Sequence, residues 1–434
     1  MKRDLMKKLA CLIALFTMQC LGQTSAVQVL GLRIYAMGDE YLPPVIAMGQ
    51  TVTIEFDVVA PHPPDLQLVF THATKDWIPE RNAFLNQEYH SKSSHLRFAV
   101  APNGVQHYAY HYKNDFPDGM GIVRFPYSGN YVFTLIDKDS ANVALGEGRF
   151  IVIEKTVGAS MRVENSVYSE RGAPYNRMNQ ITVNVNVPTP DAQPEGGQIY
   201  YPNVKCVDII QNWKMYSPIR IDVDDKDPDT FVQDAYATSK SFIIRDVFPG
   251  NEYRRLDIGS PSLYPNGELV RLREGADLSR FLWQGKIDAN GAAKLGPFTG
   301  PNSDYLEVEF RLELPSPPKN DVYLVGAFNR WQLRDDFKMA SSTSGSSVMY
   351  TLRKWIRRGV YDYQYVTAST DSVTGDIVDD DWISLEGNDW QTIDRYIAVV
   401  YYHDDRFGGF DRAVGGAVAK SPGGTGETKP DNQQ

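Results

Sequence analysis

The stretch Asp321-Val-Tyr-Leu-Val-Gly-Ala-Phe-Asn-Arg-Trp-Gln332 is the starting point for the fold of this chain. Its first five residues are mostly β-branched, aromatic or aliphatic, a composition that favours a β-strand. Gly326 then marks the point at which the strand ends in a turn. The stretch therefore predicts a strand followed by a turn that presents Asn329 and Trp331.

Similar short runs recur along almost the whole chain. They are residues 51–59, 95–100, 107–113, 130–137, 149–154, 180–187, 241–246, 305–314, 321–328, 348–355, 361–367 and 395–403. Clusters of Gly, Pro, Asn and Asp separate them, and the best helix candidate is brief, at residues 81–87. This spacing predicts antiparallel β-sandwiches rather than alternating strands and helices.

The length of 434 residues suits several domains, since one domain takes about 150 residues. We expect an all-β chain of three consecutive antiparallel, immunoglobulin-like sandwiches. Their expected bounds are 27–154, 155–300 and 301–419, and the polar residues 420–434 read as a disordered tail. The middle domain is expected to carry loop-rich insertions at 188–197 and 222–229.

The formal charge is −10, with 54 acidic and 44 basic residues. An acidic balance argues against nucleic acid as the main partner, because phosphate binding needs a basic face. Hydrophobic residues at 42% and charged residues at 23% are ordinary for a globular chain. Composition therefore excludes bulk disorder and nucleic-acid binding without naming a function.

Residues 1–26 have the pattern of a signal peptide, with a basic start, an apolar run at 9–18 and Thr24-Ser25-Ala26 before a cleavage site. Cys20 leaves lipidation open, although the residues before it fit a lipobox poorly. Cleavage after Ala26 would change the charge from −10 to −13 and leave Cys206 as the one cysteine. We therefore expect no internal disulfide, a buried Cys206 and no segment that spans a membrane.

The sequence contains none of the common motifs for nucleophilic, zinc or phosphate chemistry. His107 and His111 lie four residues apart on an expected strand, which separates them by roughly 13 Å, too far to share one ion. Asp222, Asp224, Asp225, Asp227 and Asp229 form an acidic loop that could attract calcium, but it departs from the EF-hand pattern and suits a solvated loop better. We expect no catalytic residue, no metal and no cofactor. A hydrolase with a dispersed site stays as a weaker alternative.

The stretch 321–332 resembles the first strand and turn of E-set, glycogen-binding-type modules, which carry Gly-x-Phe-x-x-Trp. The run Arg358-Gly-Val-Tyr-Asp-Tyr-Gln-Tyr-Val366 resembles a later strand of those modules. Exposed Trp faces stack on sugar rings in glycan binders. Asn329, Trp331 and Trp355 are therefore a candidate ligand or partner face. The alternative is that Trp331 packs in the core of the sandwich, so its exposure separates the two interpretations.

A longer set of segments occurs in one order along the chain. They are Asp76-Trp77-Ile-Pro-Glu80, Glu88-Tyr89, His111-Tyr-Lys-Asn-Asp-Phe-Pro117, Ser128-Gly-Asn-Tyr-Val-Phe-Thr-Leu135, Phe248-Pro-Gly-Asn-Glu-Tyr-Arg-Arg-Leu-Asp257, Gly326-Ala-Phe-Asn-Arg-Trp331, Tyr361-Asp-Tyr-Gln-Tyr-Val366, Glu386-Gly-Asn388, Tyr396-Ile-Ala-Val-Val-Tyr-Tyr402 and Asp411-Arg-Ala-Val-Gly415. Together they resemble the type IX secretion system plug family of Bacteroidetes-type bacteria. Residues 168–239 contain no such segment, and the Gly-Asn-Glu-Tyr run has one Gly fewer than the family form.

This resemblance implies a non-enzymatic periplasmic protein associated with the outer membrane through a partner. The implied partner is the large outer-membrane barrel of the secretion translocon, whose periplasmic mouth the family closes. A plug that binds and later leaves suits an interface of moderate size with a polar rim. The alternative function is a periplasmic or surface glycan-binding protein that uses the C-terminal E-set-like domain.

Overall fold

The computed structural model describes residues 27–166, 178–193, 198–236, 238–271, 275–279 and 288–422. The expected signal peptide at 1–26, with Cys20, and residues 423–434 of the expected tail lie outside this part. The strands of the described chain form six sheets, joined by turns and loops. Its helical segments are single 3₁₀ turns. The predicted all-β fold is confirmed. Residues 81–87, the helix candidate, form turns instead.

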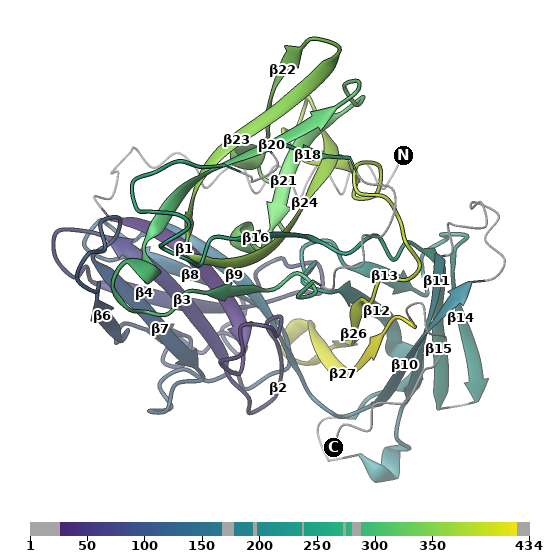
Figure 1. Cartoon of the computed structure of the whole chain (residues 1–434). Helices are drawn as coiled ribbons and strands as arrows, with labels where there is room; N and C mark the ends of the chain where they lie inside the picture. The colour runs from purple at the N-terminus through teal and green to yellow at the C-terminus, as the bar shows by residue number, and fades with distance from the viewer. Residues whose placement is uncertain are drawn as a thin grey trace.

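The first domain is a sandwich of two sheets (Figure 1). One sheet has the order β1 (Gln28–Ala36), β3 (Val52–Val59), β7 (Tyr110–Phe116), β6 (Phe98–Val100). The other has the order β2 (Val45–Ala47), β9 (Val143–Ile153), β8 (Gly129–Asp137), β4 (Leu66–Ala73), β5 (Lys92–Ser93). Inward side chains alternate with outward ones, and Phe56 stacks on Tyr112 with ring centroids 4.9 Å apart. Phe56, Phe70, Tyr112, Phe133 and Phe150 thus fill its core.

The second domain is built from two parts of the chain. One sheet has the order β10 (Gly158–Ser166), β11 (Met178–Asn186), β15 (Ser239–Val247), β14 (Thr230–Tyr236). The facing sheet has the order β13 (Ile219–Asp222), β12 (Val204–Gln211), β26 (Arg395–Asp404), β27 (Phe410–Lys420). The pairing of β12 with β26, in which Val207 lies opposite Val400, brings the end of the chain into this sandwich.

The third domain is inserted between β15 and β26. One sheet contains β16 (Arg254–Asp257), β24 (Gly359–Thr370), β19 (Ala293–Leu295), β21 (Asp321–Gly326) and β25 (Ile377–Asp381). The other contains β17 (Val270–Arg271), β18 (Asp277–Leu278), β20 (Tyr305–Leu314), β23 (Ser347–Arg357) and β22 (Ala340–Ser344). Large side chains such as Phe310, Leu324 and Tyr365 are fully buried between these sheets.

These pairings correct the consecutive arrangement expected from the sequence. The strand expected at 395–403 belongs to the second sandwich and not to the third, while β16, β17, β18 and β19 belong to the third and not to the second. Alternation of side chains identifies a strand but not its partner. Tyr396, Ala398 and Val400 face the second core, and this burial decides where β26 lies.

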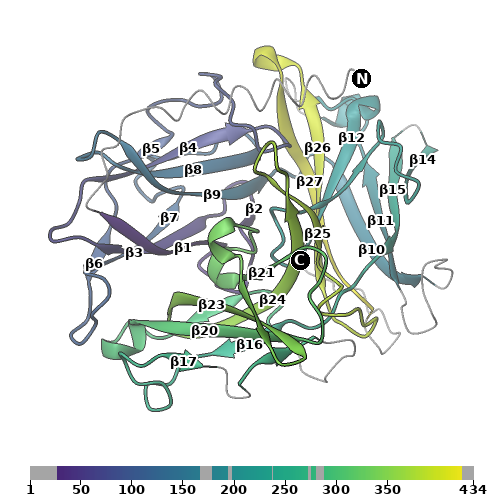
Figure 2. The same ribbon diagram turned by 90° about the horizontal axis from the view of Figure 1, so that it is seen from above.

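Seen from above, the three domains surround a common centre (Figure 2). The first domain lies on one side, the second on the other, and the third closes the gap between them. The hairpin of β26 and β27 runs along the boundary between the first two domains. Within the part of the chain that is described, no helix is long and apolar enough to span a bilayer.

Candidate functional site

Asn329 shapes the turn that follows β21. Its Oδ1 accepts the backbone N–H of Gly326 at 2.9 Å. Its Nδ2 donates to the carbonyl oxygens of Leu324 at 3.2 Å and Gln332 at 3.1 Å. Asn329 is buried, and Arg330 follows it in the left-handed region with φ of 60°. These bonds use the amide within the turn, so it presents no face to a ligand.

Trp331 lies inside the molecule, with 1% of its surface exposed. Its Nε1 donates to the carbonyl oxygen of Gly291 at 2.7 Å, and its ring packs on Tyr253 with centroids 4.3 Å apart. Gly291, with φ of 86°, has no side chain where a Cβ would stand 3.2 Å from the indole. The structure therefore shows the packing alternative for Trp331, and its burial removes the flat exposed surface that sugar stacking requires.

Trp355 lies elsewhere, on β23 at the boundary between the third and first domains. It is 52% exposed, and one face of its ring is covered by His107, with centroids 4.4 Å apart. His107 in turn contacts Asp304, with Nδ1 and Oδ1 2.9 Å apart. Trp355 thus contributes to an interdomain contact, and the structure does not bring it beside Trp331.

A buried polar cluster joins the first and third domains. Asp57 on β3 is 1% exposed, and its Oδ2 accepts the hydroxyl of Tyr305 at 2.8 Å and a guanidinium N–H of Arg357 at 3.0 Å. His111 Nδ1 lies 2.7 Å from Asp57 Oδ1. Burial, with the nearby Asp57 charge, raises the pKa of Tyr305 well above its usual range. The outward face of this sheet is therefore an interdomain contact, and His111 faces a carboxylate there.

A second ionic cluster joins the first and second domains. The Arg220 guanidinium donates to both carboxylate oxygens of Asp208, at 2.7 and 2.8 Å. It also donates to the Lys75 carbonyl oxygen at 3.0 Å and to Asp76 of the first domain. Bidentate pairs of this kind fix geometry as well as charge. The bidentate pair fixes Arg220 within the second domain, in the position from which it bonds to Lys75 and Asp76 of the first domain.

Apolar packing continues the same boundary. Ile151 of β9 shares one buried cluster with Ile210, Tyr401 and Cys206 of the second domain. Cys206 is 3% exposed, so the predicted burial of this residue is confirmed, and burial raises the pKa of its thiol. Tyr401 also donates its hydroxyl to Asn130 Oδ1 at 2.7 Å. The first two domains thus share a buried apolar cluster at their boundary, beside their own cores.

The acidic loop at 222–229 lies at the surface beside lysines. Lys75 Nζ is 3.7 Å from Asp222, and Lys205 Nζ is 3.3 Å from Asp224. Among the described residues, no group of three or more His, Cys, Asp or Glu side chains is arranged to hold a metal ion. Lysine side chains of the protein therefore lie close enough to pair with two of the aspartates of this loop.

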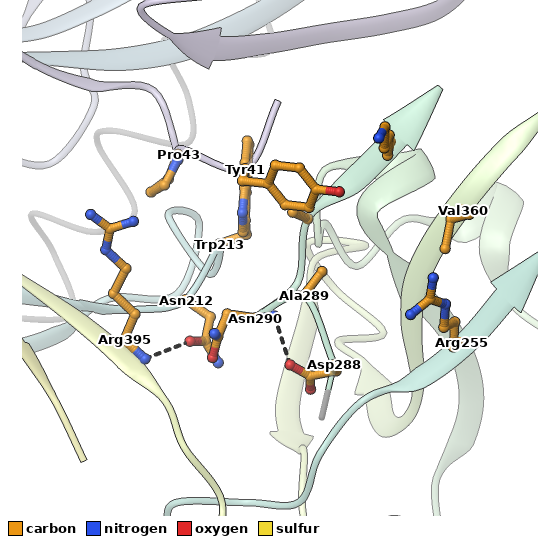
Figure 3. A pocket seen from close by; sticks show the side chains of 12 residues that line it. Tyr41, Pro43, Asn212, Trp213, Arg255, Asp288, Ala289, Asn290, Val360 and Arg395 are labelled. Carbon is orange, nitrogen blue, oxygen red and sulfur yellow. Dashed lines mark hydrogen bonds between the residues drawn. The ribbon is translucent and has the colours of Figure 1, made fainter. Parts of the chain in front are cut away.

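A cavity of about 410 Å³ opens where the three domains meet (Figure 3). The first domain contributes the loop with Tyr41 and Pro43, and the second contributes the turn after β12 and the start of β26. The third contributes β16, β19, β24 and the turn at 288–292. No sequence motif indicated this site, because its residues come from positions far apart in the chain.

Asp288, the carboxyl group that lines this cavity, has a pKa well above its usual range. Burial, then the charges of Asp362 and Glu252, raise the pKa of Asp288 to about 8. Its Oδ2 accepts the backbone N–H of Tyr253 at 2.5 Å, and its Oδ1 accepts that of Asn290 at 2.6 Å. Both oxygens are therefore used to hold the turn, and the side chain is largely neutral at pH 7.

Large apolar side chains are exposed on the first domain and on the adjoining tip of the β26–β27 hairpin. We call Phe84, Tyr89, Met120 and Phe407 the aromatic face; they are 63%, 89%, 82% and 41% exposed. Phe84 stacks on Phe407 with centroids 5.4 Å apart. The loop of Tyr89 is joined to that of Met120, since His90 Nδ1 lies 3.1 Å from the Ile122 carbonyl oxygen. Large apolar side chains exposed on neighbouring loops are typical of an interaction surface.

The chain is similar to known proteins in sequence over its first domain and in fold over most of its length. Residues 29–154 match the family model described as the type 9 secretion system plug protein first domain. Over 92% of this chain and 98% of the other, the structure is similar to the crystal structure of a hypothetical protein from Parabacteroides merdae ATCC 43184, with a TM-score of 0.72 and 21% identity. That likeness shows a shared fold across nearly the whole chain. No curated protein matches the sequence.

Proposed function

The first domain of this chain belongs to the type 9 secretion system plug family, and from this membership we propose that the whole protein closes the periplasmic opening of the secretion translocon. Its partner in this proposal is the large outer-membrane barrel of that system. The protein is a binding subunit that resides in the periplasm and performs no catalysis.

The rigidity of the domain assembly supports this function. Polar contacts join the first domain to the third through Asp57 and Arg357, and to the second through Arg220, which donates to the Lys75 carbonyl oxygen and to Asp76. The second and third domains are joined by Asn212, which donates to Tyr253 at 3.1 Å and to Asp394 at 2.7 Å. A body fixed on all three sides can cover an opening without hinge motion between its domains.

The aromatic face is the docking surface in this proposal. Three of its four residues, Phe84, Tyr89 and Met120, lie within the part of the chain that matches the plug family. Aromatic and Met side chains are enriched where protein partners bind, and a few of them supply most of the binding energy. The acidic balance of the chain would steer it toward a basic rim on the barrel.

A crosslinking experiment tests the proposal. The tagged full chain, expressed in its native envelope and crosslinked at low salt, should retrieve a barrel subunit of very large mass. Recovery of the tagged protein alone would contradict the plug function.

A surface variant tests the docking face separately. Replacing Phe84→Ser together with Tyr89→Ser should reduce barrel recovery roughly tenfold, since exposed aromatic anchors carry most of the energy of such interfaces. The matched control is Val373→Ser, a 91% exposed apolar residue on the β24–β25 turn of the third domain. Equal recovery with the double variant and with the control would show that docking uses another surface.

A further inference from the structure

Three basic side chains line the cavity at the centre of the three domains, and the described residues offer none of them an ion pair. They are Arg255 on β16, Lys294 on β19 and Arg395 at the start of β26. Figure 3 shows Arg395 on one side of the cavity and Arg255 on the opposite side. In a chain with a net charge of −10, three cations in one hollow without a described ion pair are unusual.

The acid of the cavity does not neutralise these cations. Asp288 is the one carboxylate among the described lining residues, and backbone N–H groups of Tyr253 and Asn290 occupy its oxygens. Its raised pKa keeps it largely uncharged near neutral pH. Asp362, behind the 289–291 turn, interacts electrostatically with Arg255 but does not line the cavity. The lining itself therefore has an excess of positive charge, which an anion would satisfy.

The other walls fit a flat organic body. Tyr41 and Trp213 present a phenol ring and an indole between the two arginines (Figure 3). Val360, Pro43 and Ala292 add apolar surface. The volume of about 410 Å³ falls in the range of small-molecule sites, about 300–1,000 Å³. Aromatic walls with cations at two ends favour a planar ligand over a bare inorganic ion.

We propose that this cavity binds a planar organic dianion with an acidic group at each end, one held by Arg255 and the other by Arg395. Lys294 adds a third cation, and Tyr41 and Trp213 pack on the body of the ligand. The arginines supply bidentate hydrogen bonds to carboxylate or phosphate groups. The site lies between domains and apart from the aromatic face, so the inference does not depend on the secretion function.

Calorimetric titration of the full chain with three probes tests this inference. The probes are terephthalate, which has a carboxylate at each end of a ring, benzoate, which has one, and inorganic phosphate. We expect terephthalate to bind about tenfold more tightly than benzoate, phosphate to bind most weakly, and binding to weaken as ionic strength rises. Failure of terephthalate to bind at millimolar concentration, or affinity no higher than that of benzoate, would overturn the proposal.

Variants locate the binding to the cavity. Arg255→Gln and Arg395→Gln should each lower terephthalate affinity about tenfold, to the level of benzoate, because one end of the probe loses its partner. Lys319→Gln removes one exposed positive charge from the loop between β20 and β21 and should leave the affinity unchanged. Thermal unfolding monitored by circular dichroism confirms that each variant is folded. Equal affinities in the arginine variants and the Lys319→Gln control would place the binding elsewhere.

Discussion

Replacing Trp331→Ala removes the largest fully buried side chain in the described part of the protein. Truncation of a buried Trp costs about 3–5 kcal/mol, because transfer energy is lost and a cavity remains. Trp331→Phe keeps most of the ring but leaves the Gly291 carbonyl oxygen, now 2.7 Å from Nε1, without its donor. An unsatisfied buried acceptor costs about 1–3 kcal/mol. We therefore expect the order of stability to be wild type, Trp331→Phe, Trp331→Ala.

Urea denaturation followed by circular dichroism measures these differences. The comparison is Trp355→Ala, which removes a 52% exposed indole that packs on His107 and should therefore cost clearly less than the loss of the buried Trp331 ring. Because a chain of three domains need not unfold in one step, limited proteolysis should accompany the denaturation. We expect the first new cleavage of Trp331→Ala in the third domain, around the turn that follows β21.

One result would refute this reasoning. If Trp331→Ala unfolds at the same urea concentration as Trp355→Ala, the indole does not contribute to the interior as the structure shows. If the variant also loses binding to an α-glucan that the wild type retains, Trp331 acts as a ligand residue, and the glycan alternative regains its support.

Two further predictions concern buried charge. Arg220→Ala leaves Asp208 buried without its partner, so we expect a loss of about 3–5 kcal/mol in urea denaturation, whereas Lys205→Ala, which removes an exposed pair, should change stability by about 0.5 kcal/mol or less. Asp288 has its pKa raised from 3.8 to about 8, so the folded state keeps a proton that the unfolded chain releases, and stability falls as pH rises from about 4 to about 8. Asp288→Asn removes this contribution; urea midpoints at acidic, neutral and alkaline pH should vary less in the variant, and an unchanged pH dependence would contradict the assignment.

The individual strands were accessible from the sequence because each has a clear local pattern. The expected runs 51–59 and 305–314 coincide closely with β3 (Val52–Val59) and β20 (Tyr305–Leu314). The sequence did not allow a prediction of which strands pair with one another. The run expected at 395–403 has the same apolar character whether it pairs within the third domain or with β12, and only burial of its side chains against the second core distinguishes the two.

The candidate site, too, depends on contacts between distant parts of the chain that the local sequence does not reveal. The Gly-x-Phe-x-x-Trp pattern located a turn correctly, but a Trp after a strand can point to solvent or to the interior. Whether Trp331 points inward depends on its contacts with Tyr253 and Gly291, which precede it by 78 and 40 positions in the sequence. The three cations of the cavity lie on separate strands, each an unremarkable surface position until the domains assemble.

The insertion of the third domain between β15 and β26 sets the order in which the chain can fold. Strands β1 to β9 are complete once residue 153 has been synthesised, and strands β16 to β25 once residue 381 has been. The second domain lacks β26 and β27 until residue 420, so the edge of β12 and the core positions of Tyr396, Ala398, Val400, Tyr402 and Val414 stay open while the third domain folds. An open edge of this kind can pair with other chains. The second domain is thus the last to be completed. A chain that stops before β26 leaves the free edge of β12 exposed, where it can pair with other chains and aggregate.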